Sequence, residues 1–263
     1  MKNQPIGILD SGIGGLTIWK EIVQELSYES TIYLADSKNC PYGNKTAGQI
    51  HELSRKMVQF LLKNNAKLIV IACNTITVSC LDKLRLEFPN VPIVGTVPVI
   101  KTAVSTTKNG RIGVLSTTQT ANSKYQKDLI AKFAGDRTVI NIGTDALVPL
   151  IEGGENSTSM IRIIKATVQP FKEAKIDVLA LGCSHFPLIK DQIQQLLGSN
   201  VQILDSGAAI ARQVRRVLGE RNELAYAKEP RHQFFTSGST NALLRALQSH
   251  LGYNAKDVYG LWQ

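Results

Sequence analysis

Short, continuously apolar stretches alternate with longer segments of helical spacing along the 263-residue chain. Apolar runs rich in β-branched residues are typical of strands that are buried on both faces of a parallel sheet. The predicted strands are residues 5–10, 31–36, 67–73, 91–95, 111–116, 138–143, 177–183 and 201–205. The predicted helices between them include residues 47–64, 120–134, 157–174 and 188–197. This alternation predicts an α/β fold.

The strands form two series that follow one plan. IGILDS at 6–11 corresponds to IGVLST at 112–117, and LIVIACNT at 68–75 corresponds to VLALGCSH at 178–185. We therefore predict two similar parallel-sheet α/β domains that face each other across an interdomain cleft. Residues 1–98 and 207–263 form the first predicted domain, and residues 99–206 form the second. The last segment adds predicted helices at 209–218 and 241–251 and a strand at 233–236.

Composition and charge narrow the classes of function. The net charge is +9, but Lys and Arg are spread along the chain, and their densest cluster is only Arg212, Arg215 and Arg216. A nucleic-acid-binding protein gathers its basic residues into a stripe or tail, so nucleic acid is not expected as the main partner. No apolar run reaches the length of a membrane span or signal peptide, which predicts a cytoplasmic protein without a membrane partner. A homodimer is compatible with the sequence.

The four cysteines are irregularly spaced, without a CxxC pair. With only four His in the chain, this pattern gives little support to a metal site. Cys40 lies in a predicted turn, and Cys80 lies with Leu84 on the apolar face of a helical run at 77–85. We expect both of them to have structural roles, because most cysteines in α/β proteins are small buried side chains.

Cys73 and Cys183 stand in a different setting, because each ends an apolar strand and is followed by small polar residues and a helical pattern. Ligands of open α/β sheets bind beyond the carboxyl ends of the strands. Unpaired N–H groups at the next helix's N-terminus also lower the pKa of a thiol. Two inert core thiols are the alternative interpretation. Thiols at matching places in two domains predict one cleft with a sulfur on each wall.

Two such thiols can invert a carbon centre, since one removes a proton from one face and the other supplies a proton to the opposite face. The α-proton of an amino acid is very weakly acidic, so the site must also stabilise the charge that develops on the substrate carboxylate. Backbone N–H groups and side chains near the thiols are the candidates for that role; these side chains are Ser11, Asn74, Thr75 and Ser184.

Asp10 and His185 are candidates for exchanging protons with the two thiols. Asp10 ends the first strand, and His185 follows Cys183 by two residues with a reference pKa suited to a proton shuttle. The alternatives are that Asp10 caps the helix that starts near Leu16, and that His185 is a surface imidazole.

A dinucleotide site is a competing interpretation of the loop at 10–17. Gly12 and Gly14 form a GxG, and Asp36 ends the second strand at a suitable distance for a ribose contact. The third glycine of the fingerprint is replaced by Thr17, however, and the loop begins with an acidic residue. The chain also lacks GxxxxGK[ST], and no lysine stands in a context that singles out a pyridoxal phosphate site. The sequence therefore does not favour these cofactors.

Taken together and in order, these segments resemble those of the glutamate racemases of the aspartate/glutamate racemase superfamily. The resemblance covers nearly the whole chain; its motifs are DSGxGGLT at 10–17, PYG at 41–43, ACNT at 72–75, LVPLIE at 147–152 and LGCxHxPL at 181–188. It implies a cofactor-independent enzyme, without metal or pyridoxal phosphate, that makes D-glutamate for peptidoglycan and hence for cell wall and cell shape.

The resemblance also assigns roles to residues. It implies that Cys73 and Cys183 are the catalytic acid–bases, supported by Asp10, His185 and Glu152. The implied glutamate contacts are Asp10, Ser11, Tyr42, Gly43, Asn74, Thr75, Thr117, Ser184 and His185. Three positions depart from the family pattern: Ser184 replaces threonine, Phe186 replaces tyrosine, and Gln119 replaces a glycine. The last departure puts the contacts of Thr117 and Thr120 in question, because glycine often marks tight backbone geometry.

Three other functions compete with this one. A racemase of aspartate or another small amino acid is the closest alternative, and His185 favours glutamate because the aspartate-specific relatives usually carry an acidic residue there. A thiol-redox protein would need a nearby resolving cysteine, and its absence from the sequence argues against this function. A binding module without catalysis would not need two thiols.

Overall fold

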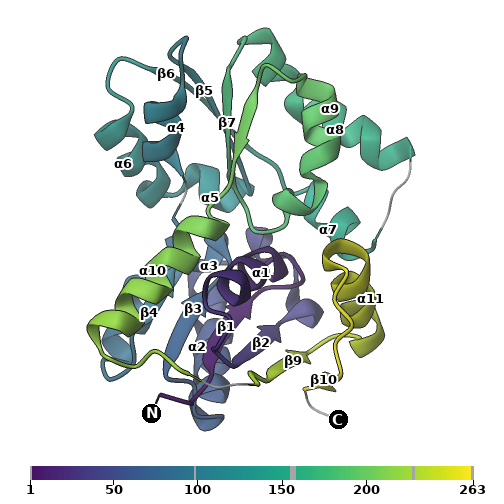
Figure 1. The fold of residues 1–263 in the computed structure, drawn as a ribbon. Helices are drawn as coiled ribbons and strands as arrows, with labels where there is room; N and C mark the ends of the chain where they lie inside the picture. The colour runs from purple at the N-terminus through teal and green to yellow at the C-terminus, as the bar shows by residue number, and fades with distance from the viewer. Residues whose placement is uncertain (1, 98, 155–157, 227–228, 262–263) are drawn as a thin grey trace. The chain divides into compact units, whose positions relative to one another are not determined.

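The computed structural model describes residues 2–97, 99–154, 158–226 and 229–261. The chain divides into two compact units (Figure 1). Unit 1 comprises Met1–Thr96 and Gly207–Gln263, and unit 2 comprises Val97–Ser206. Residue 98, where the first predicted domain segment ends, and residue 157, where one predicted helix starts, lie outside the described residues.

The core of unit 1 is a parallel six-stranded sheet in the order β10-β9-β2-β1-β3-β4. Its strands are β1 (Ile6–Asp10), β2 (Thr31–Ala35), β3 (Leu68–Ile71), β4 (Ile93–Gly95), β9 (His232–Thr236) and β10 (Asp257–Gly260). Every residue of β1, β2 and β3 is buried, which explains their unbroken apolar sequence. The returning strand β9 pairs with β2, and β10 extends that edge. The half-exposed strand β10 was not predicted, since it lacks an apolar run.

Helices cover this sheet in packed pairs. They are α1 (Leu16–Glu25), α2 (Ala47–Lys63), α3 (Asn74–Glu87), α10 (Gly207–Glu220) and α11 (Thr240–Leu251), with 3-10 turns η1 (Ser37–Asn39) and η2 (Tyr42–Asn44). Helix α1 packs beside α10, and α2 packs against α3 (Figure 1). A capping box of Thr46 and Gln49 fixes the start of α2. Gly252, in the left-handed region at φ 64°, ends α11.

Unit 2 repeats the central part of this arrangement. Its parallel sheet has the order β6-β5-β7-β8, which is the order of β2-β1-β3-β4 in unit 1. The strands are β5 (Arg111–Ser116), β6 (Thr138–Gly143), β7 (Val178–Gly182) and β8 (Gln202–Leu204). The helices are α4 (Ile100–Thr106), α5 (Thr118–Asn122), α6 (Lys124–Phe133), α7 (Leu147–Glu152), α8 (Thr158–Glu173), η3 (Phe186–Ile189) and α9 (Lys190–Leu197). The predicted fold class, with two similar parallel-sheet α/β parts, is confirmed.

One predicted helix of unit 2, at residues 120–134, is interrupted. The chain forms α5 and α6 instead, with the extended residue Ser123 between them. The Ser123 hydroxyl accepts a hydrogen bond from the N–H of Gln126 and so starts a new helix. Periodicity alone missed this break because an N-cap serine differs little from a serine within a helix.

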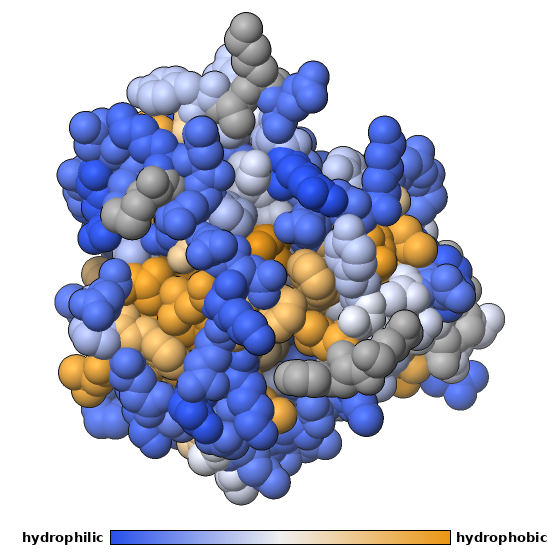
Figure 2. Space-filling model, turned by 90° about the horizontal axis from the view of Figure 1, so that it is seen from below, coloured by the Kyte–Doolittle hydropathy of each residue, from blue (hydrophilic) through white to orange (hydrophobic). Residues whose placement is uncertain are grey.

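Hydrophilic residues cover much of the face seen from below, and hydrophobic residues gather between them (Figure 2). Among the described residues, no helix is long and apolar enough to cross a membrane.

Candidate functional site

In unit 1, the predicted functional side chains lie where β1 and β3 end. Cys73 follows β3 and occupies the N-cap position of α3, a helix of 14 residues. It is 4% exposed, and its Sγ lies 3.6 Å from the hydroxyl oxygen of Ser11, which follows β1. Strands β1 and β3 are neighbours in the sheet, so their carboxyl ends bring Ser11 and Cys73 together. The helix N-terminus beside the sulfur favours the thiolate form.

The loop after β1 is tightly folded around Asp10. The N–H of Gly12 donates to Asp10 Oδ1 at 2.8 Å, and the Tyr33 hydroxyl donates to the Gly12 carbonyl at 2.6 Å. A Cβ at Gly15 would lie only 2.7 Å from the Cβ of Asp10 and 2.8 Å from that of Ala72, so this position requires glycine. Gly12 lies in the loop ahead of α1, so its hydrogen bond to Asp10 does not cap the first turn of that helix. The buried carboxylate of Asp10 is thereby fixed at the strand end.

Asn74 and Thr75 form the first turn of α3, and both are buried. Within the described part of the chain, the Asn74 side-chain amide nitrogen is buried with no hydrogen-bond partner. Buried N–H donors are normally paired, and leaving one unpaired costs about 1–3 kcal/mol. An unsatisfied donor next to a strand-end thiol is what a site for an anionic ligand requires.

Tyr42 lies in η2 and is held by Asp36, at the end of β2. Its hydroxyl donates to Asp36 Oδ2 at 2.6 Å. Burial, followed by the charge and hydrogen bond of Asp36 and the charges of Cys73 and Asp10, raises the pKa of Tyr42 far above its usual value. The tyrosine therefore stays a hydrogen-bond donor at any physiological pH. The turn η2 also packs against α3, the helix that Cys73 caps, so Tyr42 lies near that group of residues.

Asp36 has a different role from the ribose contact that the sequence suggested. Its carboxylate is committed to three side-chain donors: Tyr42, Asn39 and Ser237. Ser237 follows β9, about 200 positions away along the chain, so no local sequence signal could reveal this network. The arrangement argues against the dinucleotide interpretation of the loop.

In unit 2, Cys183 follows β7, the strand equivalent to β3. His185 Nδ1 lies 3.9 Å from Cys183 Sγ, and His185 Nε2 lies 2.6 Å from Glu152 Oε1. Cys183 and His185 are buried, and Glu152, at the end of α7, is half-buried. The interpretation of His185 as a surface imidazole is therefore wrong. The imidazole therefore lies between a thiol and a carboxylate. In this arrangement the carboxylate orients the imidazole, which can then exchange a proton with the thiol.

After Cys183 the chain forms a 3-10 turn before most of the helix predicted at 188–197. The 3-10 helix η3 begins at Phe186, and the α-helix α9 begins only at Lys190. Pro187 lies in the first turn of η3, where its missing N–H leaves no intrahelical hydrogen bond unmade. An α-helix N-terminus thus stands beside Cys73 but not beside Cys183, where the His185–Glu152 pair supplies a polar partner instead. Ser184, which separates the thiol from the imidazole in the sequence, is also buried.

Thr117 follows the neighbouring strand β5 and caps α5. Its hydroxyl donates to the Thr120 hydroxyl at 2.9 Å and accepts from the Thr120 N–H at 3.3 Å. Gln119, which replaces a glycine of the family pattern, lies half-buried within helix α5. Helical backbone accepts any residue other than proline, so the replacement does not disturb the contacts around Thr117. The Thr117–Thr120 hydrogen bonds thus form with glutamine at this position, and the glutamate contacts implied for Thr117 stay a prediction.

Within either unit taken alone, no described set of three His, Cys, Asp or Glu side chains offers ligand atoms close enough to hold a metal ion. All four cysteines are thiols.

Comparison with known proteins agrees with the family resemblance of the motifs. The model of the Asp/Glu/Hydantoin racemase family matches residues 6–214. The chain belongs to this family. It is 39% identical to the glutamate racemase of Stutzerimonas stutzeri over 252 residues, which are 95% of each protein. Among solved structures, it resembles glutamate racemase isoform RacE1 of Bacillus anthracis, with a TM-score of 0.90, 32% identity, and coverage of 99% and 98% of the two chains.

A second solved structure bears on the ligand of this racemase family. The glutamate racemase of Francisella tularensis, solved in complex with D-glutamate, has a TM-score of 0.86 and 29% identity to this chain, and covers 99% of this chain and 98% of its own. This member of the racemase family thus has two repeated sheets, and a thiol follows the equivalent strand of each.

The remaining cysteine of the core has the properties of a structural residue. Cys80 lies in α3 among apolar side chains, and its thiol contacts the Ile76 carbonyl at 3.4 Å. Burial raises its pKa to about 11. We expect iodoacetamide at about pH 7.5 to leave Cys80 unmodified in the folded protein, because the reactive thiolate is scarce there. Peptide mass spectrometry checks this, with urea-unfolded protein as the positive control.

Cys80→Ala should keep full activity and lower the free energy of unfolding by ~1 kcal/mol, the scale of an ordinary core substitution. Rapid labelling of Cys80 in the native state, or loss of activity in this variant, would contradict a structural role.

Proposed function

We propose that this protein is a cofactor-independent glutamate racemase that interconverts L- and D-glutamate with two thiols, Cys73 and Cys183. One observation carries the proposal. The two sheets share one strand order, and each thiol follows the equivalent strand, β3 in one unit and β7 in the other. Two-base inversion needs such a duplicated acid–base group. The family membership and the names of the relatives support the same activity.

The proposed reaction moves two protons. One cysteine, as thiolate, takes the α-proton of glutamate, and the electron pair left behind is delocalised into the α-carboxylate. The other cysteine, as thiol, then gives its proton to the opposite face of the α-carbon and becomes a thiolate. The reverse reaction exchanges the two roles, so one site serves both enantiomers.

In unit 1, we assign Asp10 to proton exchange with Cys73 and the polar residues nearby to substrate binding. The free amide donor of Asn74 and the N–H groups of the first turn of α3 suit a carboxylate whose charge rises during the reaction. Ser11, beside the sulfur, and Thr75 complete this group. Tyr42 and Gly43 are assigned as contacts from η2.

In unit 2, His185 is assigned as the group that exchanges protons with Cys183, and Glu152 as the group that orients the imidazole. The 2.6 Å contact of His185 with Glu152 supports this order of roles. Ser184 and Thr117 are assigned as substrate contacts. Thr117 contributes through a hydroxyl whose position is fixed by Thr120.

The proposed role is the supply of D-glutamate for peptidoglycan, with glutamate as the small-molecule partner. The D-glutamate bound to the Francisella relative supports this choice of substrate. A racemase of aspartate or another small amino acid is the alternative. Assembly as a homodimer stays a prediction, which light scattering on the purified protein tests.

A circular-dichroism assay across the L- and D-amino acids tests the proposal. We expect both enantiomers of glutamate to lose optical activity as each approaches the racemic mixture, and other amino acids to react far more slowly. Activity should survive exhaustive dialysis against a metal chelator, because thiols carry the protons, and the protein should show no visible absorbance from pyridoxal phosphate.

The control is a sample supplied with divalent metals or pyridoxal phosphate, which should gain nothing. Activity that returned only on adding either of them would refute the cofactor-independent mechanism. Faster racemisation of aspartate than of glutamate would replace the substrate while leaving the two-thiol chemistry in place.

A further inference from the structure

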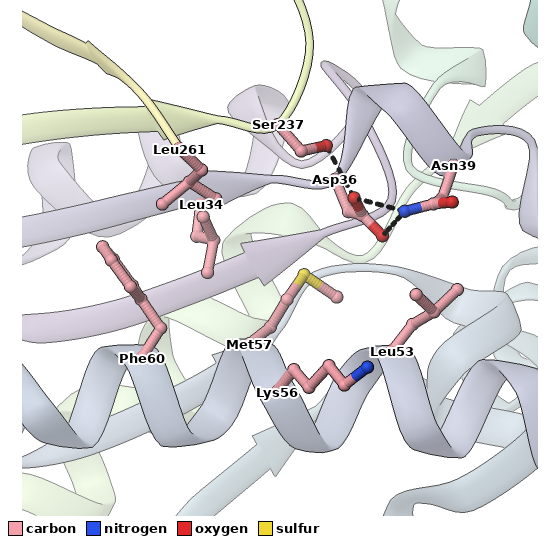
Figure 3. A pocket seen from close by; sticks show the side chains of 9 residues that line it. All are labelled: Leu34, Asp36, Asn39, Leu53, Lys56, Met57, Phe60, Ser237 and Leu261. Carbon is pink, nitrogen blue, oxygen red and sulfur yellow. Dashed lines mark hydrogen bonds between the residues drawn. The ribbon is translucent and has the colours of Figure 1, made fainter. Parts of the chain in front are cut away.

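Unit 1 holds a cavity of about 230 Å³ that the proposed reaction does not use (Figure 3). One wall is a face of α2 that includes Met57, Phe60 and Lys56, and the opposite wall includes Leu34 and Leu261. The apolar side chains point into the space between the helix and the strands, and Asp36 closes one end (Figure 3). The cavity therefore has an apolar body and one acidic end.

The carboxylate of Asp36 is unusual because it is buried and all of its hydrogen-bond partners are neutral. It is only 7% exposed and accepts hydrogen bonds from Asn39, Tyr42 and Ser237, all of which are neutral. None of the ion pairs found among the described residues involves Asp36. A buried carboxylate is normally paired with an opposite charge, and this one has only neutral hydrogen-bond partners.

The nearest basic side chain of the cavity does not supply that counterpart. Lys56 Nζ lies 3.6 Å from Glu52 on the outer surface of α2, and its side chain is 59% exposed. It stands at the rim, within the lining but outside ion-pair distance of Asp36. An occupant that carries its own positive charge would complete the arrangement.

We propose that this cavity binds a small organic cation, an amine whose ammonium group lies at Asp36 and whose apolar body lies against Met57, Phe60 and Leu261. A cavity of this volume is smaller than the usual range for drug-sized ligands, so the occupant is a compact amine with one ring or a short branched chain. The site is separate from the proposed racemase chemistry and does not depend on it. Its one link to that chemistry is the hydrogen bond from Tyr42 to Asp36.

Methionine methyl groups provide a local probe of binding. The chain has three methionines, and Met57 lines the cavity while Met160 lies in α8 of unit 2. We would label the methionine methyl carbons with ¹³C, assign Met57 with a Met57→Leu variant, and titrate the full-length protein with 2-phenylethylammonium. The Met57 methyl signal should shift in a saturable way, because a bound ring changes its local field, and the Met160 signal should stay unchanged.

Two further probes separate charge from shape. The neutral isostere 2-phenylethanol should bind at least about fivefold more weakly, because it loses the Coulomb attraction to Asp36. Methylammonium, which has the charge without the apolar body, should also bind far more weakly.

Variants then test the named residues. Lys56→Met should tighten binding of 2-phenylethylammonium by about twofold or more, since it removes a like charge at the rim. Asp36→Asn should abolish the preference for the cation over 2-phenylethanol. Leu53→Trp should fill the cavity and prevent binding, whereas the matched control Leu62→Trp, on the same helix but lining a different cavity, should leave it intact.

Equal affinity for the cation and the alcohol, or the absence of a Met57 shift at millimolar amine, would overturn the proposal. So would binding that survives Leu53→Trp. If Asp36→Asn fails to fold, Lys56→Met and Leu53→Trp still decide, because neither residue belongs to the Asp36 hydrogen-bond network.

Discussion

Replacing either Cys73 or Cys183 with alanine is expected to abolish racemisation in both directions, with a fall in kcat of at least about 10³-fold, since each thiol provides the only acid–base group for its face of the substrate. Both directions fail together because every turnover uses both faces. Circular dichroism measures the loss with L- and D-glutamate as separate substrates. Thermal unfolding of each variant should remain close to that of the parent protein, which separates a catalytic defect from misfolding.

Partial reactions distinguish the two cysteines from each other. A glutamate analogue with a leaving group on its β-carbon needs only removal of the α-proton before the leaving group departs. Each Cys→Ser or Cys→Ala variant should therefore still eliminate from one enantiomer and fail on the other, and the two variants should show opposite preferences. Release of the leaving group is the measurement.

A shared preference for the same enantiomer in both variants would show that the sulfurs do not act on opposite faces of the α-carbon, and would end the two-base mechanism. Cys80→Ala is the matched control, because this thiol lies among the apolar side chains of the core and belongs to neither strand end, so its loss should leave racemisation in place.

Replacing His185 with glutamine should lower kcat by about 10²-fold or more in both directions, the usual contribution of a positioned acid–base group. The reason is that the imidazole lies between Cys183 and Glu152, at 3.9 Å from the sulfur and 2.6 Å from the carboxylate. KM should change less than kcat if proton exchange, and not glutamate binding, is the main loss. Initial rates over a range of glutamate concentrations separate the two.

Glu152→Gln is the graded comparison for that experiment. It keeps a hydrogen-bond acceptor beside the imidazole but removes the charge, so we expect a smaller fall, of about tenfold. His250→Gln, at the end of α11, should have no effect on kcat. A His185 variant with unchanged kcat and a raised KM would assign the imidazole to substrate binding alone.

Strand placement followed closely from sequence. Strands β5 and β6 were predicted with their observed bounds, and β1, β2, β3, β4, β7 and β8 within about two residues at either end. Most of these strands are largely buried in parallel sheets, and each of those is a short apolar run. Strand β6, at an edge of its sheet, has no fully buried residue, and its β-branched residues gave the signal instead. Strand β10, with its mixture of half-buried residues, carried no such signal.

The sequence also located the two thiols and their polar neighbours, because the carboxyl end of a buried strand is recognisable from its pattern. Repetition of one plan in the two halves is enough to identify Cys73 and Cys183 as equivalent positions. The resemblance to a racemase family added roles for Glu152 and Tyr42, which periodicity alone could not provide.

Only the tertiary structure decided which side chains act together. The Glu152 carboxylate lies 33 positions from His185, and Ser237 lies about 200 positions from Asp36, yet both pairs are hydrogen-bonded. Such contacts depend on how strands order themselves in a sheet, and parallel strands place distant loops at one edge. The tertiary structure also buries the Asp36 carboxylate among neutral donors. It places an imidazole beside Cys183, whereas Cys73 stands at an α-helix N-terminus. Local sequence determines the elements and their ends; the order of strands in space, set by burial of the apolar faces, determines the partners.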